Sequence, residues 1–386
     1  MYQKLEKICL VTPIFSSQAF GGAERHAWEI AHLLSEDFEV HIVTTTALDY
    51  RTWKNFYKAG IENINNLYIY RFPVEKQRSL FFPYFHKKIL KINLNLSDKE
   101  FEKWLKLQGP YCPDLVEFLK VNIKNYYKVF YFTYLYYPVV NSLPIDKKKS
   151  ICILTLHDEP MAYFPQFKKL FTNEITYCFN TPEEKKLFEK IYDFTPSKYS
   201  IVGMHLDYLK PAKSIARKKP YVIYIGRIDA GKGILELISL FEEWLDYSQA
   251  DLELLLIGFG KLPKLENSKI FQLGYIDEEE KAGYLEGAEF LINPSQVESF
   301  SIVIMEAWLK EKAVLVNAKS EIMKNHCIRS NGGLYYYDKL SFFRTMDYLL
   351  ENPLKRKIMG QNGKRYVELN YNKERIQNKL KNLIYL

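Results

Sequence analysis

A glycine-rich turn at residues 226–233 carries two cations, Arg227 and Lys232, five residues apart. An apolar run at 221–226 precedes the turn and a helical pattern at 234–244 follows it, which predicts a strand–turn–helix unit. A guanidinium can bind two phosphate oxygens at once and an ammonium acts as a point charge, so the pair could hold one diphosphate. A solvated basic turn is the alternative. The segment is not a Walker A loop, because G-x-x-x-x-G-K-[ST] is absent.

A pair of glutamates, Glu298 and Glu306, lies in the segment 293–307, where an apolar strand is followed by a polar loop and an apolar helix. Glu306 stands inside that helix, and a carboxylate buried there needs hydrogen-bond donors. The two hydroxyls of a ribose would supply them. The alternatives are an exposed helix position for Glu306 and an interaction with the helix dipole for Glu298.

Two places in the N-terminal half also follow apolar strands. Gly21 and Gly22 open a helical pattern, where the bare backbone could approach a phosphate at a helix N-terminus. A flexible loop is the alternative there, and the dinucleotide fingerprint G-x-G-x-x-G is absent. His157 comes directly after the strand pattern at 150–156. It would project from the carboxyl end of that strand, or else be a structural histidine bonded to a neighbouring carbonyl.

Short apolar runs alternate with amphipathic segments along all 386 residues, and the hydrophobic fraction of 47% is that of a globular protein. Repeated β-α alternation predicts parallel sheets with helices on both faces, and ligands bind such sheets at the carboxyl ends of the strands. Two such series predict an α/β protein of two Rossmann-like domains facing each other across a cleft. The expected strands are 7–12, 39–45, 67–72, 128–133, 150–156 and 175–179, then 221–226, 252–258, 271–274, 289–293 and 313–317.

The two series also predict the domain limits. We expect the first domain to span 1–200 and to be joined by a C-terminal helix at 370–386, and the second to span 203–369. The segment 202–219 between the series is rich in Lys, Pro and Ala. An insertion at about 73–119 interrupts the alternation in the first domain, and its basic, aromatic sequence reads as rich in loops.

The composition limits which partners and which cellular compartment are expected. A net charge of +8 and an aromatic fraction of 16% suit an anionic partner such as a nucleotide sugar, an anionic lipid surface or nucleic acid. Five cysteines without a C-x-x-C pair argue against a disulfide framework or a zinc site and favour a reducing cytoplasm. The longest apolar stretch, 129–140, is too short for a bilayer, and the first ten residues lack the apolar core of a signal peptide. We therefore expect a cytoplasmic protein.

In this order and spacing, the motifs resemble those of glycosyltransferase family 4, a large retaining family with the GT-B fold. The resemblance covers nearly the whole chain and is strongest from 221 to 317. It rests above all on the two glutamates within N-P-S-Q-V-E-S-F-S-I-V-I-M-E-A at 293–307. The turn G-R-I-D-A-G-K-G at 226–233 is the next most specific element.

The resemblance implies contacts with the donor nucleotide, mostly in the second domain, while the first domain would face the acceptor. Gly21 and Gly22 would meet the donor phosphate. Arg227 and Lys232 would neutralise the diphosphate, and Glu306 would hold the ribose.

The resemblance also implies roles around the transferred sugar and the base. Glu298 would lie by the hydroxyls of the sugar, and His157 near the sugar at the reaction centre. Backbone groups would complete the donor site, beside the sugar at Phe300, Ser301 and Ile302 and at the nucleobase at Tyr275 and Ile276.

Two departures from the family pattern stand out. Many members have E-G-F-G where this chain has E-S-F-S, so Ser299 and Ser301 add side chains that bear on the preference for a donor sugar. The usual N-G-V-D near the domain hinge is M-H-L-D at 204–207, which bears on the hinge geometry.

The implied activity is transfer, with retention, of a hexose-type sugar from a nucleoside diphosphate sugar to a glycan or lipid-linked acceptor in bacterial surface polysaccharide assembly. D-x-D is absent, so we expect cations of the chain, and no metal, to stabilise the leaving group, with no cofactor beside the donor substrate. The alternatives with the same fold are a nucleotide-sugar epimerase and a sugar phosphorylase. A non-catalytic binder of nucleic acid or anionic surfaces is the alternative from another class; we expect no nucleic-acid partner.

Cations and aromatic residues interleave within the insertion. Such a surface can lie against an anionic membrane or stack on a glycan, so we expect it to face the acceptor and to allow peripheral contact with the inner face of the membrane. The alternative is that its rings pack on their own domain. The residues are Lys76, Arg78, Phe81, Phe82, Tyr84, Phe85, Lys87 and Lys88.

Overall fold

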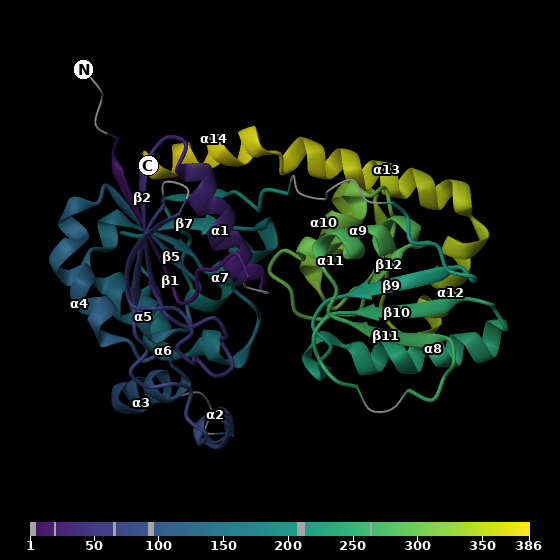
Figure 1. Cartoon of the computed structure of the whole chain (residues 1–386), viewed down its shortest axis with the longest axis horizontal. Coiled ribbons are helices and arrows are strands. Elements are labelled where there is room, and N and C mark those ends of the chain that lie inside the picture. The colour runs from purple at the N-terminus through teal and green to yellow at the C-terminus, as the bar shows by residue number, and fades with distance from the viewer. Residues whose placement is uncertain (1–4, 19–20, 65–66, 92–95, 207–212, 263–264) are drawn as a thin grey trace. The chain divides into compact units, whose positions relative to one another are not determined.

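The computed structural model describes residues 5–18, 21–64, 67–91, 96–206, 213–262 and 265–386 (Figure 1). The chain divides into two compact units. Unit 1 is Met1–Met204 together with Ile376–Leu386, and unit 2 is His205–Arg375. Of the M-H-L-D segment, Asp207 lies outside the described residues.

Unit 1 is built on an eight-stranded sheet in the order β3-β4-β2-β1-β5-β6-β7-β8. All neighbouring strands are parallel except β3 and β4, which are antiparallel. Central strands such as β5 are buried along their whole length, which is why β5 is apolar at every position after Lys128. The strands are β1 (Lys7–Thr12), β2 (Glu39–Thr45), β3 (Gly60–Ile64), β4 (Leu67–Phe72), β5 (Lys128–Phe132), β6 (Ser150–Ile153), β7 (Thr176–Phe179) and β8 (Tyr199–Ile201).

Helices connect these strands, and the end of the chain returns to unit 1. On that returning segment, Gln377 donates a hydrogen bond to the carbonyl of Leu33 (3.2 Å) and Lys379 one to the carbonyl of Ile201 (2.9 Å). The helices are α1 (Gly22–Leu34), α2 (Phe82–Lys91), α3 (Asp98–Gln108), α4 (Pro113–Asn122), α5 (Tyr137–Ser142), α6 (Pro165–Leu170), α7 (Pro182–Tyr192) and α14 (Lys373–Ile384).

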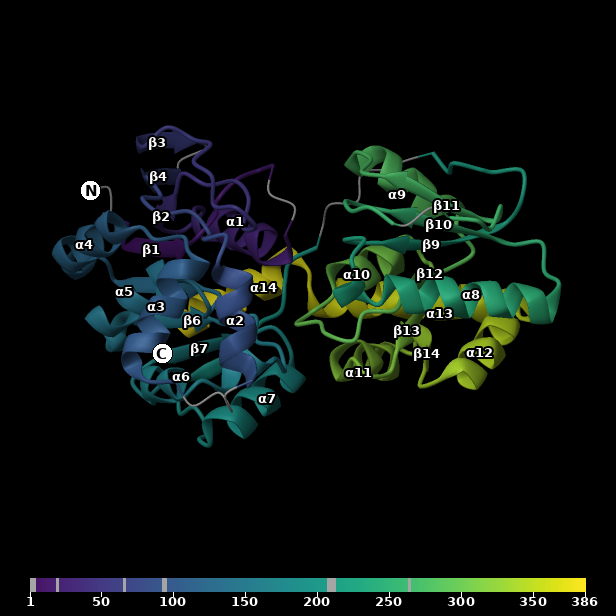
Figure 2. The same ribbon diagram turned by 90° about the horizontal axis from the view of Figure 1, so that it is seen from below.

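The insertion is helical, so its interpretation as loop-rich is wrong. It contains α2, α3 and the start of α4, and Figures 1 and 2 both draw α2 and α3 side by side at the edge of unit 1. Ser97 starts α3 with a capping box, in which its hydroxyl accepts from the amide of Glu100 and the Glu100 carboxylate accepts from the amide of Ser97. Strand β3, at the edge of the sheet, was not expected from the sequence.

Unit 2 has a six-stranded parallel sheet in the order β11-β10-β9-β12-β13-β14. Numbered within the unit, this is 3-2-1-4-5-6, the doubly wound order of a Rossmann fold. The strands are β9 (Tyr221–Ile225), β10 (Glu253–Ile257), β11 (Ile270–Gly274), β12 (Leu291–Asn293), β13 (Val314–Asn317) and β14 (Gly333–Tyr336). The helices are α8 (Ile234–Ser248), α9 (Glu278–Gly287), α10 (Ile302–Leu309), α11 (Glu321–Ser330), α12 (Lys339–Glu351) and α13 (Pro353–Asn370).

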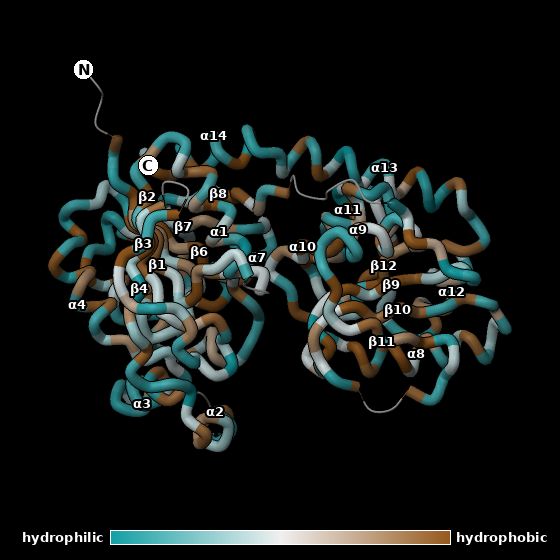
Figure 3. The backbone as a smooth tube through the Cα atoms, in the orientation of Figure 1, coloured by the Kyte–Doolittle hydropathy of each residue, from teal (hydrophilic) through white to brown (hydrophobic). Residues whose placement is uncertain are grey.

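The expected α/β class with two Rossmann-like domains is confirmed by these two sheets. In Figure 3 the hydrophobic residues gather along central strands such as β9 and β10, whereas the outer helix α13 alternates between hydrophobic and hydrophilic residues. That pattern is the one from which the strands were predicted, because a strand covered on both faces must be apolar at every position.

Candidate active site

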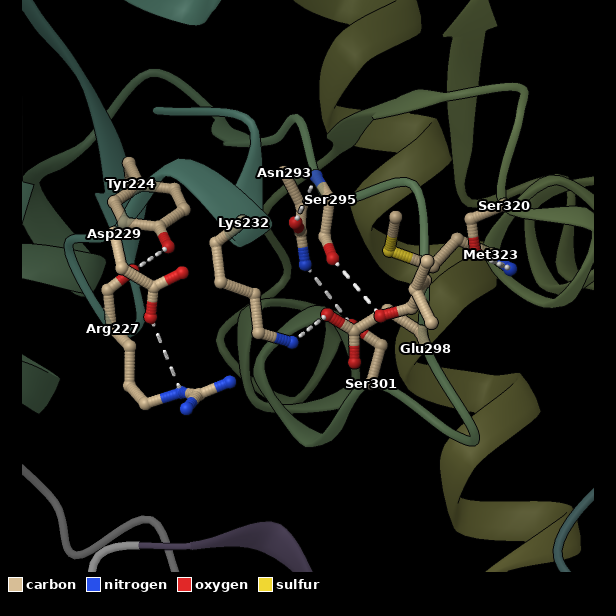
Figure 4. Close-up of polar contacts among 11 residues, drawn as sticks. Tyr224, Arg227, Asp229, Lys232, Asn293, Ser295, Glu298, Ser301, Ser320 and Met323 are labelled. Atoms are coloured by element: carbon tan, nitrogen blue, oxygen red, sulfur yellow. Dashed lines mark hydrogen bonds and ion pairs between the residues drawn. The ribbon is translucent and has the colours of Figure 1, made fainter. Parts of the chain in front are cut away.

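The strand order of unit 2 reverses direction between β9 and β12. Loops that leave the carboxyl ends of two such strands run to opposite faces of the sheet and leave a crevice that ligands occupy. Lys232 lies on the loop after β9 and Glu298 on the loop after β12, and the Lys232 Nζ to Glu298 Oε1 distance is 2.7 Å (Figure 4). Both side chains are mostly buried, with exposed fractions of 23% and 15%. Two residues chosen from separate motifs therefore meet at the expected edge of the sheet.

Gly233 explains how the two loops come so close. Its φ of +72° is one that other residues rarely adopt, and a Cβ at this position would stand 2.6 Å from the carbonyl oxygen of Pro294. The turn after β9 can lie against the loop after β12 only because Gly233 has no side chain. Lys232, its neighbour, is thereby brought to Glu298.

Arg227 extends from the same turn, and in Figure 4 its guanidinium lies on the same side of the turn as the Lys232 ammonium. The backbone below it is fixed, because the Tyr224 hydroxyl donates to the carbonyl of Arg227 at 2.7 Å. Its Nε lies 3.7 Å from Oδ2 of Asp229, and the side chain is 44% exposed. Two cationic side chains on one turn can together bind a ligand with two adjacent negative charges.

The E-S-F-S departure has a conformational consequence at Ser301. This residue precedes α10 with φ +67° and ψ +75°, a left-handed conformation that costs a non-glycine residue free energy. Asn293 donates to the Ser301 hydroxyl at 3.1 Å and accepts from the amide of Ser295 at 3.0 Å. Asn293 thus stabilises the strained serine, a role that the sequence did not indicate.

The start of α10 presents backbone rather than side-chain groups. The Ser301 side chain makes no capping hydrogen bond to the helix, so it leaves the first amides, that of Ile302 among them, to other partners. The Phe300 ring is buried and packs edge-on against His326 and Tyr371 at centroid distances of 5.6 and 5.0 Å. Burial of that ring fixes the loop that leads from Glu298 to the helix.

Glu306 is 3% exposed, so its interpretation as an exposed helix position is wrong. Its Oε1 lies 3.2 Å from Nζ of Lys281, on the neighbouring helix α9. Lys281 also pairs with Glu278 at 2.6 Å. The buried carboxylate therefore has a cationic donor from the chain itself. The sequence did not indicate Lys281, because nothing in its spacing places it beside a residue of α10.

Two exposed rings stack at the carboxyl ends of β10 and β11. Phe259 and Tyr275 have a centroid distance of 4.4 Å and an interplanar angle of 15°, with exposed fractions of 41% and 51%. Ile276 follows, and then Asp277, whose carboxylate caps α9 by accepting from the amide of Glu280. Tyr275 and Ile276 were chosen by resemblance, whereas Phe259 was missed.

Gly21 and Gly22 lie in unit 1 at the start of α1, on the loop that follows β1. Gly21 is the N-cap residue in an extended conformation, and its carbonyl accepts from the amide of Arg25 at 3.0 Å. A Cβ on Gly21 would stand 1.8 Å from a carboxylate oxygen of Glu24. Gly22 is exposed. The acidic side chain in the first turn interacts favourably with the helix dipole.

His157 also belongs to unit 1 and is half-buried in the loop after β6. A fully buried carboxylate, Glu184, holds that loop: it accepts from the amide of Leu156 at 2.8 Å and from the amide of Asn180 at 2.6 Å. Burial raises the pKa of Glu184 to about 7, although both hydrogen bonds act in the opposite direction. Thr181 caps α7 and Pro182 begins it, but the sequence indicated no role for Glu184.

Some aromatic residues of the insertion pack on their own domain, and others are exposed as expected for a surface that faces the acceptor. Phe82 is buried in the core of unit 1 and Phe85 packs against that core, so these rings face their own domain. Phe81 and Tyr84 are exposed by 76% and 75%, as is the preceding Leu80 by 96%. From Phe81 onward along α2, exposed and buried rings alternate at helical spacing.

Some cations of the insertion contact residues of their own unit, and others are exposed. Arg78 donates to the carbonyl of Gln108 at 3.2 Å and lies over the Phe82 ring, and Lys76 lies over the ring of Tyr111. Lys87 and Lys88 are exposed on α2, and Lys91, which the sequence analysis did not single out, is exposed beyond them.

No three His, Cys, Asp or Glu side chains gather as metal ligands in the described part of the chain. The five cysteines are all buried and none is bonded to another. None of the helices within the described ranges is both long and apolar enough to cross a membrane.

The chain is similar to known proteins both in sequence and in fold. Residues 208–366 match the family model described as "Glycosyl transferases group 1". An uncharacterized glycosyltransferase of Methanocaldococcus jannaschii is 23% identical over 342 residues, which is 82% of each chain. The sucrose-phosphate synthase of Thermosynechococcus elongatus has a TM-score of 0.72 at 16% identity, over 98% of both chains. HepE of Anabaena, in complex with UDP and glucose, has a TM-score of 0.67 at 12% identity, over 98% of this chain and 99% of its own. The expected GT-B fold is confirmed by these likenesses.

Proposed function

We propose that this chain, whose residues 208–366 match the family model of the group 1 glycosyl transferases, moves a hexose-type sugar from a nucleoside diphosphate to a glycan or lipid-linked acceptor. The observation that carries the proposal is the contact between Lys232 and Glu298 at the reversal point of the unit 2 sheet. It places a cation suited to phosphate directly beside a carboxylate suited to sugar hydroxyls. A sugar diphosphate has those two chemistries adjacent to one another.

The diphosphate would bind Arg227, Lys232 and the amides at the start of α10. A helix N-terminus favours anions, and cations fixed in place stabilise the charge that grows on a departing phosphate. HepE of Anabaena, which has the same fold, forms a complex with UDP and glucose, and this supports a donor of this kind.

The nucleoside would extend from the phosphates toward α9 and β11. Glu306 reaches α9 through Lys281, and the segment just before α9 carries Tyr275. A ribose at Glu306 would therefore leave its base near the stacked rings of Tyr275 and Phe259. Exposed aromatic faces suit a nucleobase, because stacking does not depend on which base is present.

The reaction would break the bond between the anomeric carbon of the sugar and the diphosphate oxygen, and would form a bond from the acceptor oxygen to the same carbon. The acceptor proton would pass to the departing phosphate oxygen on the same face, which preserves the anomeric configuration. His157 is the proposed contact of the transferred sugar in unit 1. Cations of the chain would take the place of a metal.

The acceptor would meet the exposed side of α2. Three apolar side chains, Leu80, Phe81 and Tyr84, are solvent-exposed there, with Lys87 and Lys88 beyond them. Rings at headgroup depth and lysines near lipid phosphates are a combination that binds anionic membranes. We therefore propose a lipid-linked glycan acceptor, as in bacterial surface polysaccharide assembly, reached by peripheral contact with the inner face of the membrane.

The test is a two-step assay. Thermal shift with UDP, GDP, ADP, CMP and dTDP identifies the nucleotide, since a ligand raises stability by RT ln(1 + [L]/Kd). The matching nucleotide sugar is then incubated with glycan acceptors, with and without EDTA. Transfer that survives EDTA and keeps the anomeric configuration supports the proposal. Loss of turnover in EDTA that Mg²⁺ or Mn²⁺ restores would rule out the metal-free mechanism. Rapid conversion of the nucleotide sugar without any acceptor would favour an epimerase.

A further inference from the structure

A second hollow in unit 2 lies at the amino ends of β12 and β13. Its volume is about 600 Å³, within the range of small-molecule sites. In a parallel sheet the amino ends lie at the edge opposite to the carboxyl ends, where Lys232 and Glu298 meet. The lining comes from 286–289 at the end of α9, 309–313 after α10, and α13 at positions 353, 356, 357 and 364.

Two glycines of α13 fix the walls of the hollow. A Cβ on Gly360 would stand 1.8 Å from the carbonyl oxygen of Glu311, and one on Gly363 would stand 2.1 Å from the Trp308 ring. Helix α13 therefore lies in direct contact with the turn that follows α10. Glu311 itself has a φ of +55°, so the turn is tightly bent. These contacts hold the turn that contributes 309–313 to the lining against the helix that contributes the opposite wall.

The charges on the lining do not balance. Five cations and three carboxylates line the hollow. Each carboxylate is already paired: Glu286 with Lys310 at 3.6 Å, Glu311 with Lys364 at 3.0 Å, and Glu289 with Arg356. Two ammonium groups are left over, Lys312 and Lys357, and neither forms an ion pair with any residue that the structure describes.

Lys312 is the more informative of the two cations. It is half-buried, and that burial lowers its pKa. Glu286, Glu289 and Glu311 attract this ammonium, but each of them is paired with another cation, and the cost of burial still outweighs their effect. An anionic ligand would offset that remaining cost. The walls are mostly charged, so a hydrophilic ligand suits them better than an apolar one.

We propose that this hollow binds a phosphate-bearing anion through Lys312 and Lys357. The site is separate from the proposed donor site, because the eight residues of α10 span about 12 Å between Ser301 at one end and the hollow at the other. A phosphomonoester metabolite and inorganic phosphate share the required chemistry.

The test is calorimetric titration of the full chain with sodium phosphate, and separately with glucose 6-phosphate, at constant ionic strength. The background is the Arg227→Ala/Lys232→Ala variant, so that phosphate cannot be scored at the proposed donor site. We expect saturable binding that weakens at least tenfold when Lys312→Met and Lys357→Met are added. Lys355→Met, on α13 but outside the lining, should leave it unchanged.

The outcomes distinguish a phosphorylated metabolite from free phosphate, and loss of the binding site from misfolding of the variant. Tighter binding of glucose 6-phosphate than of phosphate indicates a metabolite, and equal binding indicates the free ion. The Lys312→Arg variant keeps the charge and should retain affinity, which guards against a loss caused by misfolding. No binding in the background variant, or binding unaffected by Lys312→Met/Lys357→Met, overturns the proposal. Neither result bears on the proposed transferase activity.

Discussion

The carboxylate of Glu184 accepts a hydrogen bond from the amide of Leu156, the residue directly before His157, at 2.8 Å. The same carboxylate accepts from Asn180 at the end of the next strand, so one buried group ties two adjacent loops together. Thr155, one residue earlier, has a φ of +49°, which a β-branched residue rarely adopts. Glu184 is therefore a positioning residue for His157.

Glu184→Gln should lower the free energy of unfolding by about 1–3 kcal/mol, because an amide NH2 would face one of the two backbone N–H donors. We expect kcat to fall while the affinity for the nucleoside diphosphate stays the same, since the side chains proposed to bind the nucleotide lie in unit 2. Steady-state kinetics and calorimetry measure the two effects. Equal loss of both would indicate a general folding defect instead.

The raised pKa of Glu184 also predicts a pH dependence. Burial raises the pKa of this carboxyl from its ordinary value of 4.5 to about 7 in the folded protein, so between these values the folded state binds more protons than the unfolded state. The contribution of this group to stability is present below about pH 4.5 and is lost as the pH rises to about 7. Urea unfolding of the wild type against Glu184→Gln across that window should show the difference.

Lys232→Ala and Arg227→Ala should each reduce turnover at least about a hundredfold, the scale of one lost charge contact in a transition state. Arg227 is 44% exposed, so the melting temperature of its variant should change little, whereas Lys232→Ala also removes the mostly buried ion pair with Glu298 and should lower the melting temperature more. Lys324→Ala, which breaks an ion pair with Glu321 elsewhere in unit 2, is the control and should keep full activity. Near-normal turnover in either variant would place the diphosphate elsewhere.

Glu306→Gln should weaken binding of the free nucleoside diphosphate about tenfold, as expected for one charged hydrogen bond of about 1.4 kcal/mol. The rate at saturating donor should fall less, because ribose contacts are present in the ground state and the transition state alike. A double variant with Lys281→Met separates the ribose contact from the ion pair at 3.2 Å. Unchanged affinity in both would make Glu306 a structural residue.

Ser301 allows a matched pair of substitutions. Ser301→Ala keeps the left-handed conformation, which costs roughly 1–2 kcal/mol, and loses the hydrogen bond from Asn293. Ser301→Gly loses the same bond but relieves the strain. In denaturant unfolding, Ser301→Ala should therefore have a lower free energy of unfolding than Ser301→Gly. The opposite order would show that the strain at this position is negligible.

The exposed side of α2 should bind anionic vesicles at low salt and release them at high salt. Arg78 holds the carbonyl of Gln108, so the informative cations are Lys87, Lys88 and Lys91. Changing these three to Ala should abolish sedimentation with anionic vesicles and leave neutral vesicles unbound, as before. Leu354→Ser/Ile358→Ser, at exposed apolar positions on α13, is the control. No association under any condition would favour a soluble acceptor.

Local patterns in the sequence predicted the sheets well. Strand β9 is apolar throughout and β10 is apolar after Glu253, because both faces of a parallel sheet are covered. The segment that forms α2 gave no such signal, since exposed and buried rings follow one another along it. Its helical spacing becomes clear only when Phe82 and Ile89 are seen to face the core.

The sequence indicated individual residues of the candidate site but not the contacts between them. Lys232 and Glu298 were each chosen from a motif, whereas their meeting depends on strand order and on Gly233. Glu184 and Lys281 were missed for the same reason: each acts on a residue of another element, and no local spacing records such a contact.

The bare backbone at Gly233 has a consequence for how such a protein can diversify. Because this residue touches the carbonyl of Pro294 without any side chain between them, the two loops are held together by main-chain geometry. The identity of the residue at 298 or 301 is then free to change without moving the turn that carries Lys232. Under the proposed function, a descendant of this chain could change its donor sugar through residues 298–301 and keep its nucleotide contacts, provided that position 233 remained glycine.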